Sequence, residues 1–207
     1  MCSSDLGENI VTTYSSQVTI TSSDVSATLP APANLTNGVG TFSVTLFTAG
    51  SRTITATASG PIVGTSNVTV NPAAGAVLDF AVQPTNTVSS VNFAPSPTVR
   101  VLDAFGNLAS GSTNVTLAIA PGTGPVGATL AGTATVASVN GVATFSGLSI
   151  AKAGTAYQLA ATAAGLTSAT SAAAAFSGMK GSAWVSRASM RVRSISASAG
   201  GPTSSVT

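Results

Sequence analysis

Short runs in which apolar and polar residues alternate fill most of the 207-residue chain. Val18 and Ile20 fall on one face of such a run, and Leu78, Phe80 and Val82 fall on one face of another. A period of two residues, with clusters of Gly, Pro, Asn or Ser between the runs, predicts short β-strands. The expected strands are 17–22, 41–48, 52–59, 67–71, 77–82, 98–102, 115–119, 133–139, 142–150, 157–162 and a last one ending near residue 176.

The pattern is repeated once along the chain. The segment GVGTFSVTLFTAGSRTITATASG begins at Gly38, and a related segment, GVATFSGLSIAKAGTAYQLAATAAG, begins at Gly141. Phe145 follows Phe42 by 103 positions, so the repeated unit is a whole domain and not a short solenoid repeat. About seven strands in the second copy match an immunoglobulin-like sandwich of roughly 100 residues. We therefore expect an all-β fold of tandem immunoglobulin-like β-sandwiches, the first one truncated. The second copy should be an antiparallel sandwich with six residues buried together: Phe80, Val101, Leu117, Phe145, Tyr157 and Leu159. In the first copy Val68 should point inward.

The repeat register sets the expected domain boundaries. Residues 73–177 form the complete repeat, and residues 7–72 form a truncated repeat that lacks its first two strands, because Gly7–Ile10 aligns with Phe105–Leu108. Residues 1–6 (MCSSDL) resemble a translated sequencing adapter and are expected to be non-native. Residues 178–207 are expected to be a basic, low-complexity or out-of-frame tail. The natural protein is expected to continue upstream, so the sequence is treated as a fragment.

The repeat register also decides between helix and strand for an Ala-rich stretch between Thr162 and Phe176. Helix propensity alone favours a helix over residues 172–175. The repeat aligns this stretch with the strand expected at residues 67–70, so we predict a final strand here.

Composition points to a protein outside the cell. Charged residues make up 6% of the chain, against about 25% in typical soluble domains. There is no histidine and the one cysteine is Cys2, so no intrachain disulfide and no His- or Cys-based metal site can form. The sequence contains no run of about 18 apolar residues, so it does not suggest a membrane span. The tail carries a net charge of +4, whereas residues 7–177 carry −1. The basic character therefore belongs to the tail, and we expect no nucleic-acid partner.

Several motifs resemble the bacterial immunoglobulin-like (Big-type) tandem repeats of large surface, adhesin-like or secreted proteins. They are VRVLDAFGN, ending at Asn107, SSDVSATLP at 22–30, and the paired GVxTFS blocks followed by AGxxxxxxAT. In immunoglobulin-type domains a tyrosine near the start of strand F closes a corner through its hydroxyl, and Tyr157 is so placed. The resemblance implies a stalk module, located outside the cell or on its surface.

The sequence offers few side chains that could act in catalysis or bind a metal ion. The acids of the repeats are Glu8, Asp24, Asp79 and Asp103, and turn capping explains Asp24 and Asp103 better than a catalytic carboxylate pair does. Calcium at the joint between repeats, with Asp103 and Asn107 as ligands, is left open, although few carboxylates are present. Lys152 is expected to be an exposed loop residue and not part of an isopeptide bond. We predict no catalytic, cofactor-binding or metal-binding residues, and no enzyme activity.

Two functions of different class remain. The favoured one is a non-catalytic structural spacer whose partners are neighbouring repeats of the same chain, with a short joint at Asn71–Gly75 that limits bending. The alternative is an adhesion module that binds an extracellular glycan or protein through end loops, near residues such as Asn107 or Asn140. Sugar-binding platforms commonly use exposed aromatic rings, and the repeats hold no Trp and only Tyr14 and Tyr157. This favours the spacer.

Overall fold

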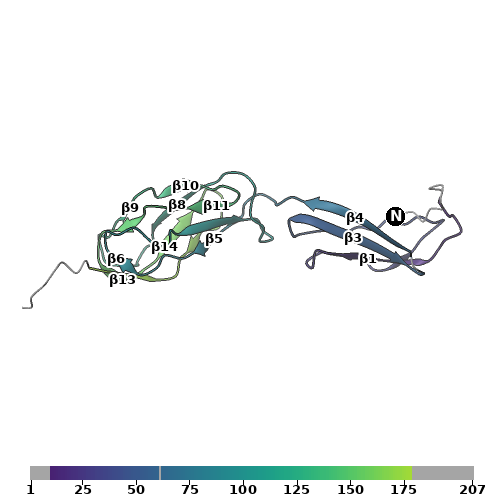
Figure 1. Ribbon diagram of the computed structural model, residues 1–207, viewed down its shortest axis with the longest axis horizontal. Coiled ribbons are helices and arrows are strands. Elements are labelled where there is room, and N and C mark those ends of the chain that lie inside the picture. The colour runs from purple at the N-terminus through teal and green to yellow at the C-terminus, as the bar shows by residue number, and fades with distance from the viewer. Residues whose placement is uncertain (1–9, 61, 179–207) are drawn as a thin grey trace, which may run out of the picture.

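The computed structural model describes residues 10–60 and 62–178, which form an all-β protein. The strands fall into two groups that lie end to end, joined by one connection between β4 and β5 (Figure 1). The N-terminal group is one antiparallel four-stranded sheet with the order β2-β1-β3-β4. Its strands are β1 (Gln17–Ser22), β2 (Ala33–Asn34), β3 (Gly50–Ala58) and β4 (Val63–Val70).

The C-terminal group contains twelve shorter strands, where the sequence predicted about seven. They pair in the orders β10-β8-β14-β15, β11-β7-β5, β12-β9 and β13-β16-β6. The strands are β5 (Val77–Val82), β6 (Thr87–Val88), β7 (Thr98–Leu102), β8 (Asn114–Ile119), β9 (Leu130–Ala131), β10 (Thr135–Ala137), β11 (Val142–Thr144), β12 (Ser149–Ile150), β13 (Gly154–Tyr157), β14 (Leu159–Thr162), β15 (Ala169–Thr170) and β16 (Ala174–Ser177). The number is higher because the predicted strand 142–150 is interrupted by a turn and because β6 and β9 lie outside the predicted strands.

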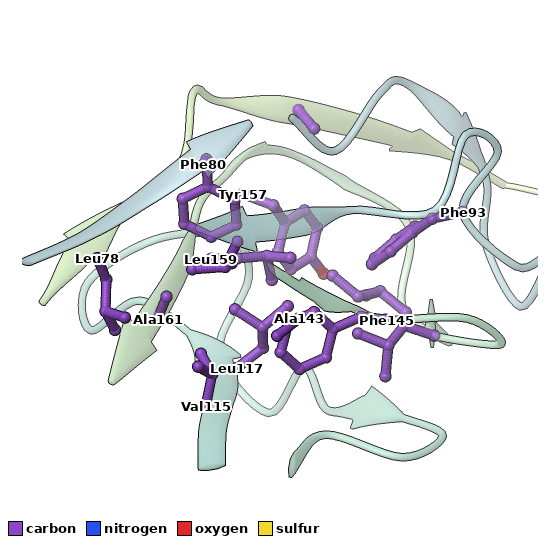
Figure 2. Close-up of a cluster of buried hydrophobic side chains, with 14 of the residues drawn as sticks. Leu78, Phe80, Phe93, Val115, Leu117, Ala143, Phe145, Tyr157, Leu159 and Ala161 are labelled. Atoms are coloured by element: carbon purple, nitrogen blue, oxygen red, sulfur yellow. The ribbon is translucent and has the colours of Figure 1, made fainter. Parts of the chain in front are cut away.

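Each strand group has its own hydrophobic core. The C-terminal core is a cluster of 17 buried side chains, many of which Figure 2 draws. The six residues predicted to be buried together all belong to it: Phe80, Val101, Leu117, Phe145, Tyr157 and Leu159. Among the described residues, the N-terminal core has four buried members, Val18, Ile20, Leu35 and Ala56. The C-terminal group therefore has the larger core.

Two Asn-Gly turns show that the repeat in sequence is also a repeat in conformation. Asn37 and Asn140 both have φ of 50°, and the glycines that follow them, Gly38 and Gly141, both have φ of 76°. In each turn the flanking residues exchange two backbone hydrogen bonds. Positive φ at both central positions matches the right-handed twist of a hairpin, and Asn-Gly is the preferred pair for it.

The strand predicted at 41–48 is wrong. Only Thr45 in this range makes a ladder contact, an isolated bridge to Thr28. In the second copy, β11 corresponds to residues 39–41 and pairs with β7. Residues 10–60 and 62–70 contain no equivalent of β7, so apart from Thr45 residues 41–48 have no ladder partner among them.

Three smaller predictions also need correction. The predicted strand 142–150 divides into β11 and β12 around a turn that contains Gly147. The sheet pairing is not purely antiparallel, because β16 runs parallel to β6. Val68 was expected to point inward, but it is 36% exposed because β4 is the outer strand of its sheet.

The Ala-rich stretch follows the repeat register and not helix propensity. It contains β15 and β16, and Phe176 is buried against the rings of Phe93 and Tyr157. The strand prediction is therefore confirmed. In the part of the chain that the structure describes, no helix has the length and apolar character needed to cross a membrane.

Candidate functional site

Three residues singled out by the sequence, Asp24, Asp103 and Asn107, lie where the two strand groups join. The connecting segment runs from Asn71 to Ala76, between β4 and β5. The backbone N–H of Ala73 donates to Asp103 Oδ2 at 3.0 Å, and the N–H of Ala76 donates to the carbonyl of Leu102 at 2.7 Å. The connection is thus fixed to the DAFGN turn (residues 103–107) of the C-terminal group.

Asp103 organises this turn. Its Oδ1 accepts the N–H groups of Phe105 and Asn107, both at 2.9 Å, and its Oδ2 accepts Asn107 Nδ2 at 2.9 Å in addition to Ala73. The residue is only 2% exposed. Burial raises the pKa of Asp103, but the hydrogen bonds from Asn107, Ala73 and Phe105 outweigh it and lower the pKa to about 2. The carboxylate is therefore ionised at neutral pH and fully engaged.

Asn107 carries the contact from the turn to the other strand group. Its Oδ1 accepts the N–H of Ala49 at 2.9 Å, and its Nδ2 donates to the carbonyl of Phe47 at 2.8 Å. Next to these bonds the rings of Phe47 and Phe105 pack with centroids 5.0 Å apart. Both hydrogen bonds go to backbone atoms, so Asn107 recognises the shape of the 47–49 loop and not its side chains.

Asp24 holds that loop from the N-terminal side. Its Oδ2 accepts the N–H groups of Phe47 at 2.7 Å and Thr48 at 2.9 Å, and its Oδ1 accepts the Thr48 hydroxyl at 2.6 Å and the N–H of Ser26 at 3.0 Å. The hydrogen bond from the Thr48 hydroxyl, with those from the backbone, holds the pKa of Asp24 well below its usual range despite burial. A buried carboxylate therefore fixes each side of the joint.

Arg52 completes the loop. Its Nε donates to the carbonyl of Thr48 at 2.9 Å, and its Nη2 donates to the carbonyl of Ala49 at 2.7 Å. The loop presents one N–H and one carbonyl to Asn107, while its other polar groups are bound within the N-terminal group. This preorganisation reduces the entropy lost when the joint forms.

The other candidate residues lie away from the joint. Asp79 pairs with Arg100 on the neighbouring strand β7. Lys152 is exposed, as predicted, and its Nζ donates to the carbonyl of Val126 at 2.6 Å. Glu8 lies outside the described residues. Within 10–60 and 62–178 no three acids, cysteines or histidines come together as a possible metal site.

The tyrosine corner predicted from the sequence is present. Tyr157 is 1% exposed, and its hydroxyl donates to the carbonyl of Lys152, five residues earlier, at 2.8 Å. Burial raises the pKa of its phenol. Thr53 occupies the matching position in the first copy, where its hydroxyl donates to Asn67 Oδ1. The corner therefore stabilises the second copy only.

The sequence identified part of this site. The turn-capping roles of Asp24 and Asp103 are confirmed, since each accepts the N–H of the residue two positions later. The joint contacts of Phe47, Ala49 and Arg52 were missed. The sequence offered one signal for the hydrogen bonds of Asp24 to that loop. An acid in a turn without a nearby base needs several N–H donors when it is buried.

No protein-family model matches the chain, and no curated protein matches it. Among solved structures, a β-glycosidase from Bacteroides vulgatus is similar at 13% identity with a TM-score of 0.41, covering 77% of this chain and 21% of the glycosidase. Domains 4 and 5 of the S-layer protein SbsC are similar at 15% identity with a TM-score of 0.35, covering 85% of this chain and 79% of that structure. A structure of SbsC domains 4–9 is similar at 14% identity with a TM-score of 0.36, covering 86% and 24%. The chain thus spans about a fifth of the length of the glycosidase. With TM-scores below 0.5, these similarities carry no argument about function.

Proposed function

We propose that the chain is a non-catalytic spacer from a bacterial extracellular or cell-surface protein, built from tandem immunoglobulin-like sandwiches. The joint supports this proposal most directly. Asn107, Asp103 and the Phe47–Phe105 pair link the two strand groups through side chains on both sides of the connection. A linker without such contacts would allow free bending, whereas a spacer must keep its parts in line.

The engagement of the acids supports the absence of catalysis in this proposal. General acid–base chemistry needs a carboxyl group that a substrate can reach. The oxygens of Asp24 and Asp103 accept hydrogen bonds from the protein itself, and Asp79 pairs with Arg100. Each of these acids therefore already has a structural role.

A distance measurement between the two strand groups tests the spacer. Spin labels at the exposed positions Thr19 and Ala118, in a Cys2→Ser background, report the separation by double electron–electron resonance. We expect one narrow distance distribution. Asn107→Ala should broaden it, because the variant removes two hydrogen bonds across the joint, together worth about 1–3 kcal/mol. Asn34→Ala is the matched control, because Asn34 is exposed on β2, and it should leave the distribution narrow.

A broad distribution in the unmodified chain would contradict a stiff spacer. So would an Asn107→Ala distribution identical to that of the control.

A second measurement addresses the alternative of an adhesion module: the chain is screened against a glycan array, calcium, and ester and glycoside substrates. Saturable micromolar glycan binding that is lost in an Asn140 variant would favour the adhesion module, and turnover of any substrate would contradict both functions.

A further inference from the structure

The N-terminal strand group has an open apolar groove. Its lining includes Val18 and Ile20 of β1, Ile54 and Ala56 of β3, and Phe42 and Val44 from the segment that forms no strand. The groove has a volume of about 330 Å³. Phe42, Val44 and Ile54 are only half-buried, so these side chains face a space that the described residues do not fill.

The second copy shows how the same positions look when they are covered. Phe145 corresponds to Phe42 and Ala143 corresponds to Gly40, and both residues of the second copy are 0% exposed. The Asn-Gly turns just before these segments have the same φ angles in both copies. The segments therefore start from the same conformation and differ in what covers them.

The cover in the second copy is the strand β7. It runs antiparallel to β11, with Val99 opposite Ala143 and Thr98 opposite Thr144. Val99 and Val101 are both 0% exposed and belong to the same buried cluster as Phe145. In the first copy, residues 40–44 have no ladder partner among residues 10–60 and 62–178. Their N–H and carbonyl groups make no backbone hydrogen bond with the described residues and lie beside the groove.

We propose that the groove is an acceptor site for a β-strand with the sequence pattern of β7, two valine-sized residues separated by one polar residue. The strand runs antiparallel to residues 40–44. Its backbone pairs with their unpaired groups, and its alternate side chains fill the groove, which is the logic of β-strand addition. A second copy of this chain does not supply the strand, because its own Val99 and Val101 are fully buried.

The test adds a peptide with the sequence of residues 96–104 to the full chain and measures amide hydrogen exchange by NMR. We expect exchange at residues 40–44 to slow by about tenfold or more, because the strand supplies hydrogen-bond partners. The matched control is the same peptide with Val99→Ser and Val101→Ser. It keeps the backbone groups and the charges but loses the side chains that enter the groove, so it should give no protection. Changes in the peptide cannot unfold the chain.

A second form, in which the strand is joined to the chain, tests the proposal if the free peptide binds too weakly. An extra copy of residues 76–104 is inserted ahead of Gly7, which raises the effective strand concentration to about millimolar. Protection of residues 40–44 in either form, absent with the serine-substituted sequence, supports the proposal. Equal protection by both sequences, or no protection in either form, overturns it. Dimerisation of the unmodified chain with protection of the same residues also overturns it, because the occupant is then a second copy.

Discussion

Replacing Phe145 by alanine tests the difference between the two cores. Phe145 is 0% exposed and lies within the cluster that Figure 2 draws. Removing roughly 100 Å² of buried apolar surface at about 25 cal/mol per Å² costs about 2.5 kcal/mol. A residual cavity of roughly 80 Å³ at about 24 cal/mol per Å³ costs about 2 kcal/mol more. We therefore expect Phe145→Ala to lower the free energy of unfolding of the C-terminal group by about 3–5 kcal/mol.

The first copy provides a matched comparison at Phe42. This residue has the same place in the repeat, but it is half-buried beside the open groove. Its removal exposes less new apolar surface and leaves no closed cavity, so Phe42→Ala should cost about 1 kcal/mol. The difference between the two variants measures what the covering strands β5 and β7 contribute at this position.

Urea titrations followed by methyl NMR separate the two groups. Signals of Leu117 and Leu159 report the C-terminal core, and those of Ile20 report the N-terminal core. For each variant the free energy of unfolding is extrapolated to water, and an unchanged slope shows that the unfolded state is comparable. A loss below about 1 kcal/mol in Phe145→Ala, or an equal loss in Phe42→Ala, would refute the reasoning.

Two further predictions concern buried polar groups. Tyr157→Phe should lower the free energy of unfolding of the C-terminal group by about 1–2 kcal/mol in urea titrations, because it removes the hydrogen bond from the buried tyrosine to the carbonyl of Lys152. Tyr14→Phe, whose exposed hydroxyl donates to the carbonyl of Ser59, should cost less than about 0.5 kcal/mol. Equal costs would contradict this. The low pKa of Asp103 stabilises the folded state above the unfolded-state value of about 3.9, and this stabilisation is lost as the pH falls towards about 2. In urea titrations between pH 4 and pH 2, the free energy of unfolding of the C-terminal group should fall less steeply with decreasing pH in Asp103→Asn than in the unmodified chain. Asp24→Asn, in the other strand group, should leave that pH dependence unchanged. The same pH dependence in both variants would disprove the role of Asp103.

The sequence predicted the strands best where several local signals agree. The bounds of β1, β5 and β7 were predicted to the residue, because alternation, β-branching and flanking turn residues agree at these segments. The prediction failed at 41–48, although the alternation of Phe42, Val44 and Leu46 is as regular as in the others. A strand also needs a neighbour for its hydrogen bonds, and local pattern contains no information about that neighbour.

The joint shows the same division between what local sequence predicts and what depends on distant residues. The turn-forming residues Asp103 and Asn107 could be identified from sequence, since Asp and Asn side chains bind nearby backbone N–H groups. The partners of Asn107 could not, because Phe47 and Ala49 lie 60 and 58 positions away along the chain. Such pairs depend on how the two strand groups meet.

By itself, therefore, the sequence determined the all-β class, the repeat and its register, the buried residues of the second copy, and the turns at Asp24 and Asp103. These features depend on local alternation and on the side-chain chemistry of single turns. Only the tertiary structure decided that Asn107 spans the joint, that two buried carboxylates fix its two sides, and that the face around Phe42 is open. These features depend on contacts between residues far apart in sequence, and the free energy of such contacts is set by burial and geometry that no local pattern encodes.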